Sequence, residues 1–158
     1  MKKIILIAVM ALGFAVTAAA QPRAIGARLG YGAEVSYQHS LGSNFIQADL
    51  GLIGFGANLN ANATYNWMIA QPQWADRGEW GFYAGPGVGV GFGGVSGVGF
   101  NFGVVGMVGL EYTFWFPLQL SIDLRPQIGC VIVPEAGAVF YNKGLLGFAP
   151  TISVRYRF

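Results

Sequence analysis

The stretch that decides the fold is residues 80–110, which read WGFYAGPGVGVGFGGVSGVGFNFGVVGMVGL. These 31 residues carry no charged side chain, and about 20 apolar residues are enough for a membrane-spanning helix. Twelve of the 31 are glycine, however, and one is Pro86. Because each glycine costs a helix about 1 kcal/mol and a proline about 3 kcal/mol relative to alanine, a helix is disfavoured by more than about ten kcal/mol. We therefore expect this stretch to be extended.

The same stretch has the two-residue period of a β-strand. Between Trp80 and Phe92, apolar side chains stand at the even positions, and glycine or tyrosine stands at the odd ones, so the two faces of the strand differ. The alternation recurs in residues 58–67, 98–112, 118–125 and 151–158. The second face consists mostly of Gly, Asn, Ser and Gln, whereas a soluble sandwich carries charged residues there. The pattern predicts an all-β protein.

The composition is apolar and nearly neutral. The chain has 158 residues, of which 54% are hydrophobic and 10% charged, and a mean hydropathy of +0.50. Nine Lys and Arg oppose seven Asp and Glu. A disordered chain is excluded because disorder requires low hydrophobicity. A nucleic-acid partner is excluded because the cations are too few to neutralise several phosphates.

The first twenty residues have the pattern of a secretory signal peptide. Lys2 and Lys3 precede an apolar run at 4–16, and three alanines at 18–20 form an A-x-A cleavage site. We expect residues 1–20 to be removed and residues 21–158 to form a single domain. A membrane anchor, the alternative, needs a longer apolar run. Cys130 is the only cysteine, so an internal disulfide cannot stabilise the fold.

Charged side chains in the expected strands all fall on the polar face. Strands can cross a bilayer only when every backbone group is paired, so an apolar face opposite an ionic one predicts a closed transmembrane barrel. We expect these charges to pair across a narrow, filled lumen. A soluble barrel with an apolar interior is the alternative. The lumen charges are Arg28, Glu34, Asp49, Glu111, Asp123, Arg125, Arg155 and Arg157.

Turn-forming residues divide residues 21–158 into an eight-stranded antiparallel up-and-down β-barrel. Six breaks alone give seven segments, whereas both termini of a bacterial barrel lie on the periplasmic side, which requires an even number. We therefore place a further reversal at Tyr31, Gly32 and Ala33, where glycine allows a tight turn. One long first strand with a hairpin at 142–144 is the alternative. The six breaks lie at 41–44, 54–56, 70–79, 93–97, 115–117 and 133–144.

Aromatic side chains form two girdles on the apolar face, as expected at the two interfaces of a membrane. Tyr31, Phe92 and Phe100 lie at the outer ends of the strands. The outer loops are then short, and the longest, 133–144, is the expected place for a partner contact. The periplasmic girdle consists of Tyr37, Tyr65, Trp67, Trp80, Phe82, Tyr112, Phe114, Tyr156 and Phe158.

With eight such segments and a last strand that reads Ser-Val-Arg-Tyr-Arg-Phe, the chain resembles the small eight-stranded outer-membrane β-barrels of Gram-negative bacteria, the OmpX-like and OmpA-transmembrane-like class. The resemblance implies an outer-membrane protein with a structural or surface-interaction role, in contact with outer-membrane lipid and lipopolysaccharide. It also implies that the barrel-assembly machinery reads the closing strand. The residues concerned are Ile152, Val154, Tyr156 and Phe158. We expect a monomer.

Candidate catalytic and metal-binding residues are few. His39 is the only histidine, and with Ser36, Ser40 and Glu34 nearby, an outer-membrane enzyme that modifies lipid A is an alternative function. His39 and Ser36 point to opposite faces of a strand, whereas a nucleophile needs its base within hydrogen-bond reach. We therefore expect no catalysis. One His and one Cys offer no zinc-ligand spacing, so we expect neither metal nor cofactor.

Four glycines alternate along the first half of the opening stretch. They do not form a phosphate-binding loop, because such loops lead into a helix and carry a lysine. We expect Gly85, Gly87, Gly89 and Gly91 to leave room in the lumen for Arg28, Arg125, Arg155 or Arg157. A filled lumen predicts a protein that does not conduct ions, and a narrow channel is the remaining alternative.

Overall fold

The computed structural model describes residues 23–54, 58–93, 99–133, 137–142 and 149–158. The predicted signal peptide lies outside these ranges, as do most of the predicted turns at 54–56 and 93–97. No helix in this part of the chain is long and apolar enough to span a membrane. The described residues form ten strands: β1 (Arg23–Leu29), β2 (Gly32–Leu41), β3 (Asn44–Ile53), β4 (Asn58–Ala70), β5 (Glu79–Gly93), β6 (Gly99–Thr113), β7 (Leu118–Leu124), β8 (Gln127–Val133), β9 (Gly137–Asn142) and β10 (Thr151–Arg157).

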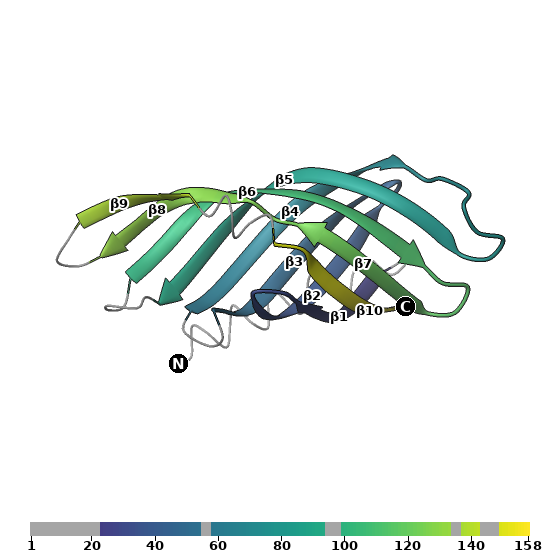
Figure 1. Ribbon diagram of the computed structural model, residues 1–158, viewed down its shortest axis with the longest axis horizontal. Coiled ribbons are helices and arrows are strands. Elements are labelled where there is room, and N and C mark those ends of the chain that lie inside the picture. The colour runs from purple at the N-terminus through teal and green to yellow at the C-terminus, as the bar shows by residue number, and fades with distance from the viewer. Residues whose placement is uncertain (1–22, 55–57, 94–98, 134–136, 143–148) are drawn as a thin grey trace.

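The ten strands occupy eight positions in one closed antiparallel ring (Figure 1). Neighbours from β1 to β6 pair in chain order, and β10 returns to pair with β1. β7 and β8 share the seventh position, because the second half of β6 pairs with β7 and its first half pairs with β8. β9 and β10 share the eighth position, since they pair with β8 and β7. The predicted eight-stranded antiparallel β-barrel is confirmed.

A proline divides the seventh position into β7 and β8. Pro126 has no N–H to donate to a neighbouring strand. Its carbonyl oxygen nevertheless accepts a hydrogen bond from the backbone N–H of Gly106, with an N···O distance of 2.9 Å. The wall therefore stays closed across the break.

The loop predicted at 133–144 is wrong in its middle part. Residues 137–142 form β9, which pairs with β8 from Gly137 to Asn142. The sequence AVFY within β9 is rich in residues that favour strands, and Gly137 has a φ of 78° that helps to reverse the chain before it. Eight residues lie between Asn142 and Thr151, against four between their partners Ile128 and Asp123. The stretch of chain that joins β9 to β10 is therefore four residues longer than the stretch between the partner residues.

The additional reversal near the start of the barrel is confirmed. β1 ends at Leu29 and β2 begins at Gly32, so one long first strand is wrong. The backbone N–H of Gly30 donates to the carbonyl oxygen of Gly32 across the turn, at 3.1 Å. The turn predicted at 41–44 is also present, with Gly42 at a φ of 68°, and residues 71–78 and 114–117 join the strands that were expected to follow one another.

The two ends of the described wall meet. The backbone N–H of Arg23 donates to the carbonyl oxygen of Phe158 at 3.0 Å, and the N–H of Phe158 donates to the carbonyl oxygen of Arg23 at 2.9 Å. Three connections, β2–β3, β4–β5 and β6–β7, share this end with Arg23 and Phe158, and the β8–β9 hairpin projects at the opposite end (Figure 1). We call the end with Arg23 and Phe158 the termini end of the barrel, and the end with the β8–β9 hairpin the hairpin end.

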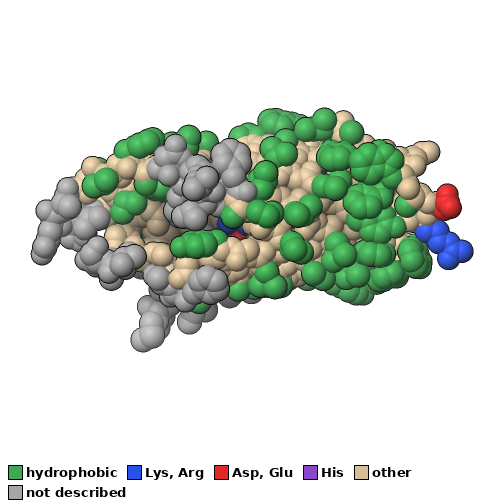
Figure 2. Space-filling view, in the orientation of Figure 1, with side chains coloured by type: hydrophobic (Ala, Val, Ile, Leu, Met, Phe, Trp, Pro, Cys, Tyr) green, Lys and Arg blue, Asp and Glu red, His purple; other side chains and the backbone are tan. Residues whose placement is uncertain are grey.

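Polar side chains point into the barrel and apolar ones point out. In β2, for example, Glu34, Ser36 and Gln38 are buried, whereas Val35 between them is 59% exposed. Figure 2 shows hydrophobic side chains spread over the outer wall, with charged groups at the termini end. This sidedness is the reverse of a soluble barrel, in which the apolar face is buried.

The glycines of β5 have neighbours other than the predicted arginines. A Cβ added to Gly85 would overlap the carbonyl oxygen of Tyr65 on β4, and one added to Gly89 would overlap the side chain of Asn62. The nearest atoms to Gly87 and Gly91 also belong to adjacent backbone or to uncharged polar side chains. The predicted role in making space for arginines is therefore wrong. At Gly85 the missing side chain instead lets β4 and β5 approach closely, as tight curvature requires.

This close approach predicts that Gly85→Ala destabilises the barrel. Overpacking costs about 1–3 kcal/mol, and we expect that loss in the free energy of unfolding, measured by urea titration in detergent micelles with tryptophan fluorescence. The control is Gly106→Ala, because a Cβ there meets only Pro126 Cγ at 3.6 Å. Equal stability of the two variants would contradict the packing argument.

Candidate functional site

The most distinctive site in the described residues is an ion-pair network that crosses the lumen. Arg28 Nη1 lies 2.7 Å from Glu34 Oε2, and Arg28 Nη2 contacts Asp123 Oδ1 on β7, which β10 separates from β1 in the ring. Arg125 Nη2 lies 2.7 Å from Glu34 Oε1, and its Nη1 lies 2.9 Å from Asp49 Oδ2. These five residues come from β1, β2, β3, β7 and the β7–β8 link. The network therefore ties distant parts of the wall together.

Uncharged side chains extend the network by hydrogen bonds. Gln47 Nε2 donates to Asp49 Oδ2 at 2.9 Å, and Gln38 Nε2 donates to Gln47 Oε1 at 3.0 Å. The hydroxyl of Tyr83 donates to Asp123 Oδ2 at 3.3 Å. Each carboxylate of the network thus accepts hydrogen bonds from at least two side chains. Buried charges are stable only when they are paired and hydrogen-bonded in this way.

Three of the eight predicted lumen charges lie outside the network. Arg155 is fully buried, and it donates from Nε to Ser36 Oγ at 3.0 Å and from Nη1 to Ser121 Oγ at 2.8 Å. Glu111 Oε2 accepts a hydrogen bond from Gln119 Nε2 at 2.8 Å. Arg157 lines a cavity at the termini end. The expected pairing therefore brings together five residues, and the other three lie outside the network.

An apolar block inside the lumen was missed by the sequence reasoning. Phe45 and Tyr83 meet edge to face with ring centroids 5.1 Å apart, and Met107 packs with them, all three buried. These residues stand on the mostly polar face of their strands. A signal was present in the pairing: Tyr83 lies directly opposite Gly109 on β6, and a side chain at Gly109 would overlap the Tyr83 ring. A large inward residue paired with a glycine on the neighbouring strand indicates a filled lumen.

The aromatic side chains predicted for the girdle lie on the outside at the termini end. Trp80 and Tyr112 have ring centroids 4.7 Å apart, and Tyr112 and Phe114 have centroids 4.6 Å apart. Trp74 packs on Trp80 at 5.9 Å and was not predicted. Further members are Tyr65 with Trp67, Tyr156 with Phe158, and Trp115 with Phe116. At the hairpin end, Phe92 and Phe100 have centroids 4.9 Å apart.

The wall separates the residues that suggested an enzyme. His39 is half-buried beside Tyr37, whose hydroxyl lies 3.4 Å from His39 Nδ1. Ser36 is buried in the lumen, where its Oγ accepts a hydrogen bond from Arg155. No group of three or more His, Cys, Asp or Glu in the described part of the chain has an arrangement that could hold a metal ion.

Comparison with known proteins finds no counterpart. No model of a known protein family, no curated protein and no solved structure matches the chain. The site must therefore be interpreted from its own geometry.

The geometry predicts that Asp123→Asn weakens the barrel strongly. The substitution removes a buried charge that faces Arg28, and breaking a buried ion pair costs about 3–5 kcal/mol. The free energy of unfolding in micelles measures the loss. The double variant Arg28→Met/Asp123→Leu replaces both charges with apolar groups and is expected to recover most of the stability. Additive losses in the double variant would contradict the pairing.

Proposed function

We propose that this chain is a monomeric integral outer-membrane β-barrel protein with a structural or surface-interaction role and no catalytic step. The observation that carries the proposal is the sidedness of the wall, with exposed apolar side chains outside and an ionic network within. In water, an apolar patch of more than a few hundred Å² is rare on a monomer. In a bilayer, the same apolar wall contacts lipid, and closure of β1 to β7 and β10 into a ring pairs the backbone groups of neighbouring strands.

The aromatic girdle supports the same orientation. Tyr and Trp rings favour the interfaces of a membrane, where one part of the ring is apolar and the other is wet. We place the termini end at the periplasmic interface, and lipid and lipopolysaccharide around the wall. The signal that we propose for the barrel-assembly machinery consists of Ile152, Val154 and Tyr156 on β10 and Phe158 directly after it.

For the surface-interaction role, we propose the β8–β9 hairpin as the contact region. It projects furthest from the termini end (Figure 1). Among the described residues, β9 pairs only with β8, so its other edge has no strand beside it. Phe140 on this strand is 67% exposed. An exposed strand edge with apolar side chains is a template for an added strand.

Membrane insertion is tested by placing a charge on the outer wall. Val88 faces outward near the middle of β5 and is 61% exposed. In phospholipid vesicles, we expect Val88→Arg to lower the free energy of unfolding by about 2–4 kcal/mol, because arginine is costly at the bilayer midplane. Leu41→Arg, beside the β2–β3 turn, is the control and should cost about 1 kcal/mol or less.

A water-soluble barrel would respond differently. Substitution of an exposed residue in water usually changes stability by no more than about 0.5 kcal/mol. If Val88→Arg and Leu41→Arg both stay within that range, the outer wall does not face lipid and the proposal fails.

The filled lumen predicts that the protein does not conduct ions. An eight-stranded barrel is just wide enough for side chains to fill it, and here the ion-pair network and the apolar block of Phe45, Tyr83 and Met107 lie across it. In planar bilayers, we expect no steady current from the purified protein. A steady current that disappears without the protein would favour the narrow channel instead.

A further inference from the structure

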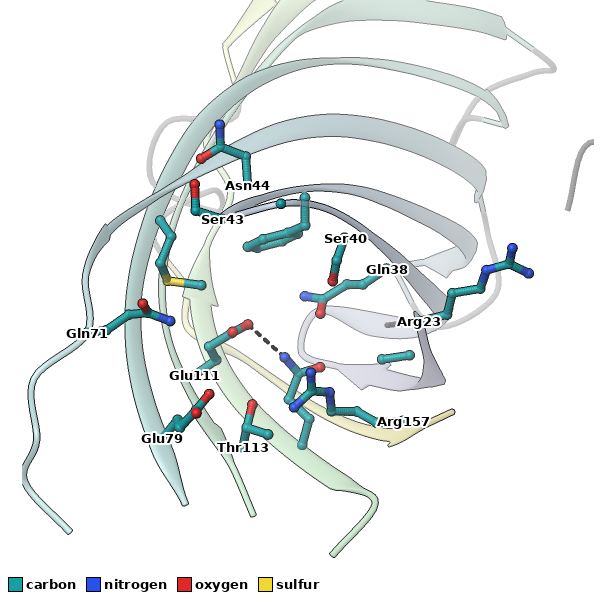
Figure 3. A pocket seen from close by; sticks show the side chains of 15 residues that line it. Arg23, Gln38, Ser40, Ser43, Asn44, Gln71, Glu79, Glu111, Thr113 and Arg157 are labelled. Carbon is teal, nitrogen blue, oxygen red and sulfur yellow. Dashed lines mark hydrogen bonds between the residues drawn. The ribbon is translucent and has the colours of Figure 1, made fainter. Parts of the chain in front are cut away.

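The termini end of the barrel contains a cavity of about 180 Å³ (Figure 3). Its lining comes from β10 and from each of β1 to β7, so the cavity is the mouth of the lumen. Phe45 and Met68 contribute apolar surface to it. Phe45 belongs to the apolar block, and Met68 packs against it. The block therefore lies between the cavity and the rest of the lumen.

Negative and positive groups enter this cavity from different strands. Glu111 comes from β6 and Arg157 from β10. Figure 3 shows both side chains turned toward the cavity, whereas Arg23 extends away from it. Glu79 and Arg23 also line the cavity, so two anionic and two cationic side chains surround a single small volume.

Next to Glu111, the cavity has a second acceptor that is not used. The Nε2 of Gln119 donates to Glu111, at 2.8 Å. The Oε1 of Gln119 is buried and has no hydrogen-bond partner among the described residues. A buried acceptor without a partner costs about 1–3 kcal/mol, so a donor placed there would be favourable. An ammonium group, with three donors and a positive charge, suits a carboxylate and an amide oxygen together.

We propose that this cavity binds a small zwitterion that carries an ammonium group and an anionic oxygen group. The ammonium group binds Glu111 and Gln119 Oε1, and the anionic group binds the guanidinium of Arg157, which matches carboxylates and phosphates well. A lone cation would meet the charge of Arg157, and a lone anion would meet that of Glu111, so a ligand with both charges fits best. The inference requires the barrel but not its insertion in a membrane.

The size of the cavity limits the ligand. A cavity of about 150 Å³ can hold benzene, so a free amino acid as small as alanine fits within 180 Å³. The same two groups occur in the headgroup of a zwitterionic phospholipid, whose remainder would extend through the mouth. L-alanine and glycerophosphoethanolamine therefore represent the two sources of this chemistry.

The two methionines of the barrel make binding observable. The full chain has four methionines, and Met1 and Met10 lie in the predicted signal peptide. Met68 lines the cavity, and Met107 is buried in the apolar block. The full chain is expressed in cells supplied with ¹³C-methyl methionine, and the purified barrel is studied by NMR. We expect either zwitterion to shift the Met68 methyl resonance in a saturable way. The Met107 resonance should move little, and the tighter ligand identifies the source.

Single-charge analogues and variants decide the assignment. Ethylamine and propionate carry one group each and should bind at least tenfold more weakly than L-alanine. Glu111→Gln and Arg157→Gln should each weaken zwitterion binding at least tenfold, with the Met107 resonance in place as evidence of folding. Asp76→Asn removes a charge from the 71–78 loop outside the cavity and should bind like the wild type.

Three results would overturn the proposal. One is the absence of a saturable Met68 shift with both zwitterions. Another is equal binding of ethylamine or propionate. The third is unchanged binding by folded Glu111→Gln and Arg157→Gln, since the charges would then play no part.

Discussion

Closure of the backbone hydrogen bonds between β1 and β10 is the constraint on which the rest of the structure depends. Six residue pairs, from Ala24↔Arg157 to Leu29↔Ile152, join the first strand to the last. With eight positions in the ring, the interior is only as wide as the side chains that fill it. Inward side chains must therefore contact one another, and any charge among them must find a partner there. The ion-pair network follows from the narrowness of the ring.

The same narrowness explains why large and very small residues oppose one another. Tyr83 fills space that Gly109 leaves empty, and Asn62 occupies the place of a side chain at Gly89. Glycines such as Gly89 and Gly109 thus serve interior packing, and the outward residues between them form the outer wall.

Much of this architecture could be predicted from alternation and turn residues. A period of two assigns each side chain to one face, so the inward position of residues such as Arg28 and Asp123 followed from parity alone. Their contact did not follow from parity, because the two residues are 95 positions apart in the chain and meet only when the ring closes through β10. The strand β9 was missed because the turn signals of 133–144 favoured one continuous loop, and pairing with β8 outweighs those local signals. The apolar block was missed because Phe45 and Met107 are exceptions on an otherwise polar face.

The reciprocal hydrogen bonds between Arg23 and Phe158 make the wall a ring whose first and last residues are neighbours. The chain could therefore be joined at these two residues and opened elsewhere without changing which strands pair. A short linker across these residues, with new ends opened at Gly42 and Ser43, would give a circular permutant with the same pairing but with an internal β10. Such a molecule would distinguish what stabilises the finished ring from what a cell needs at the carboxyl terminus to build it.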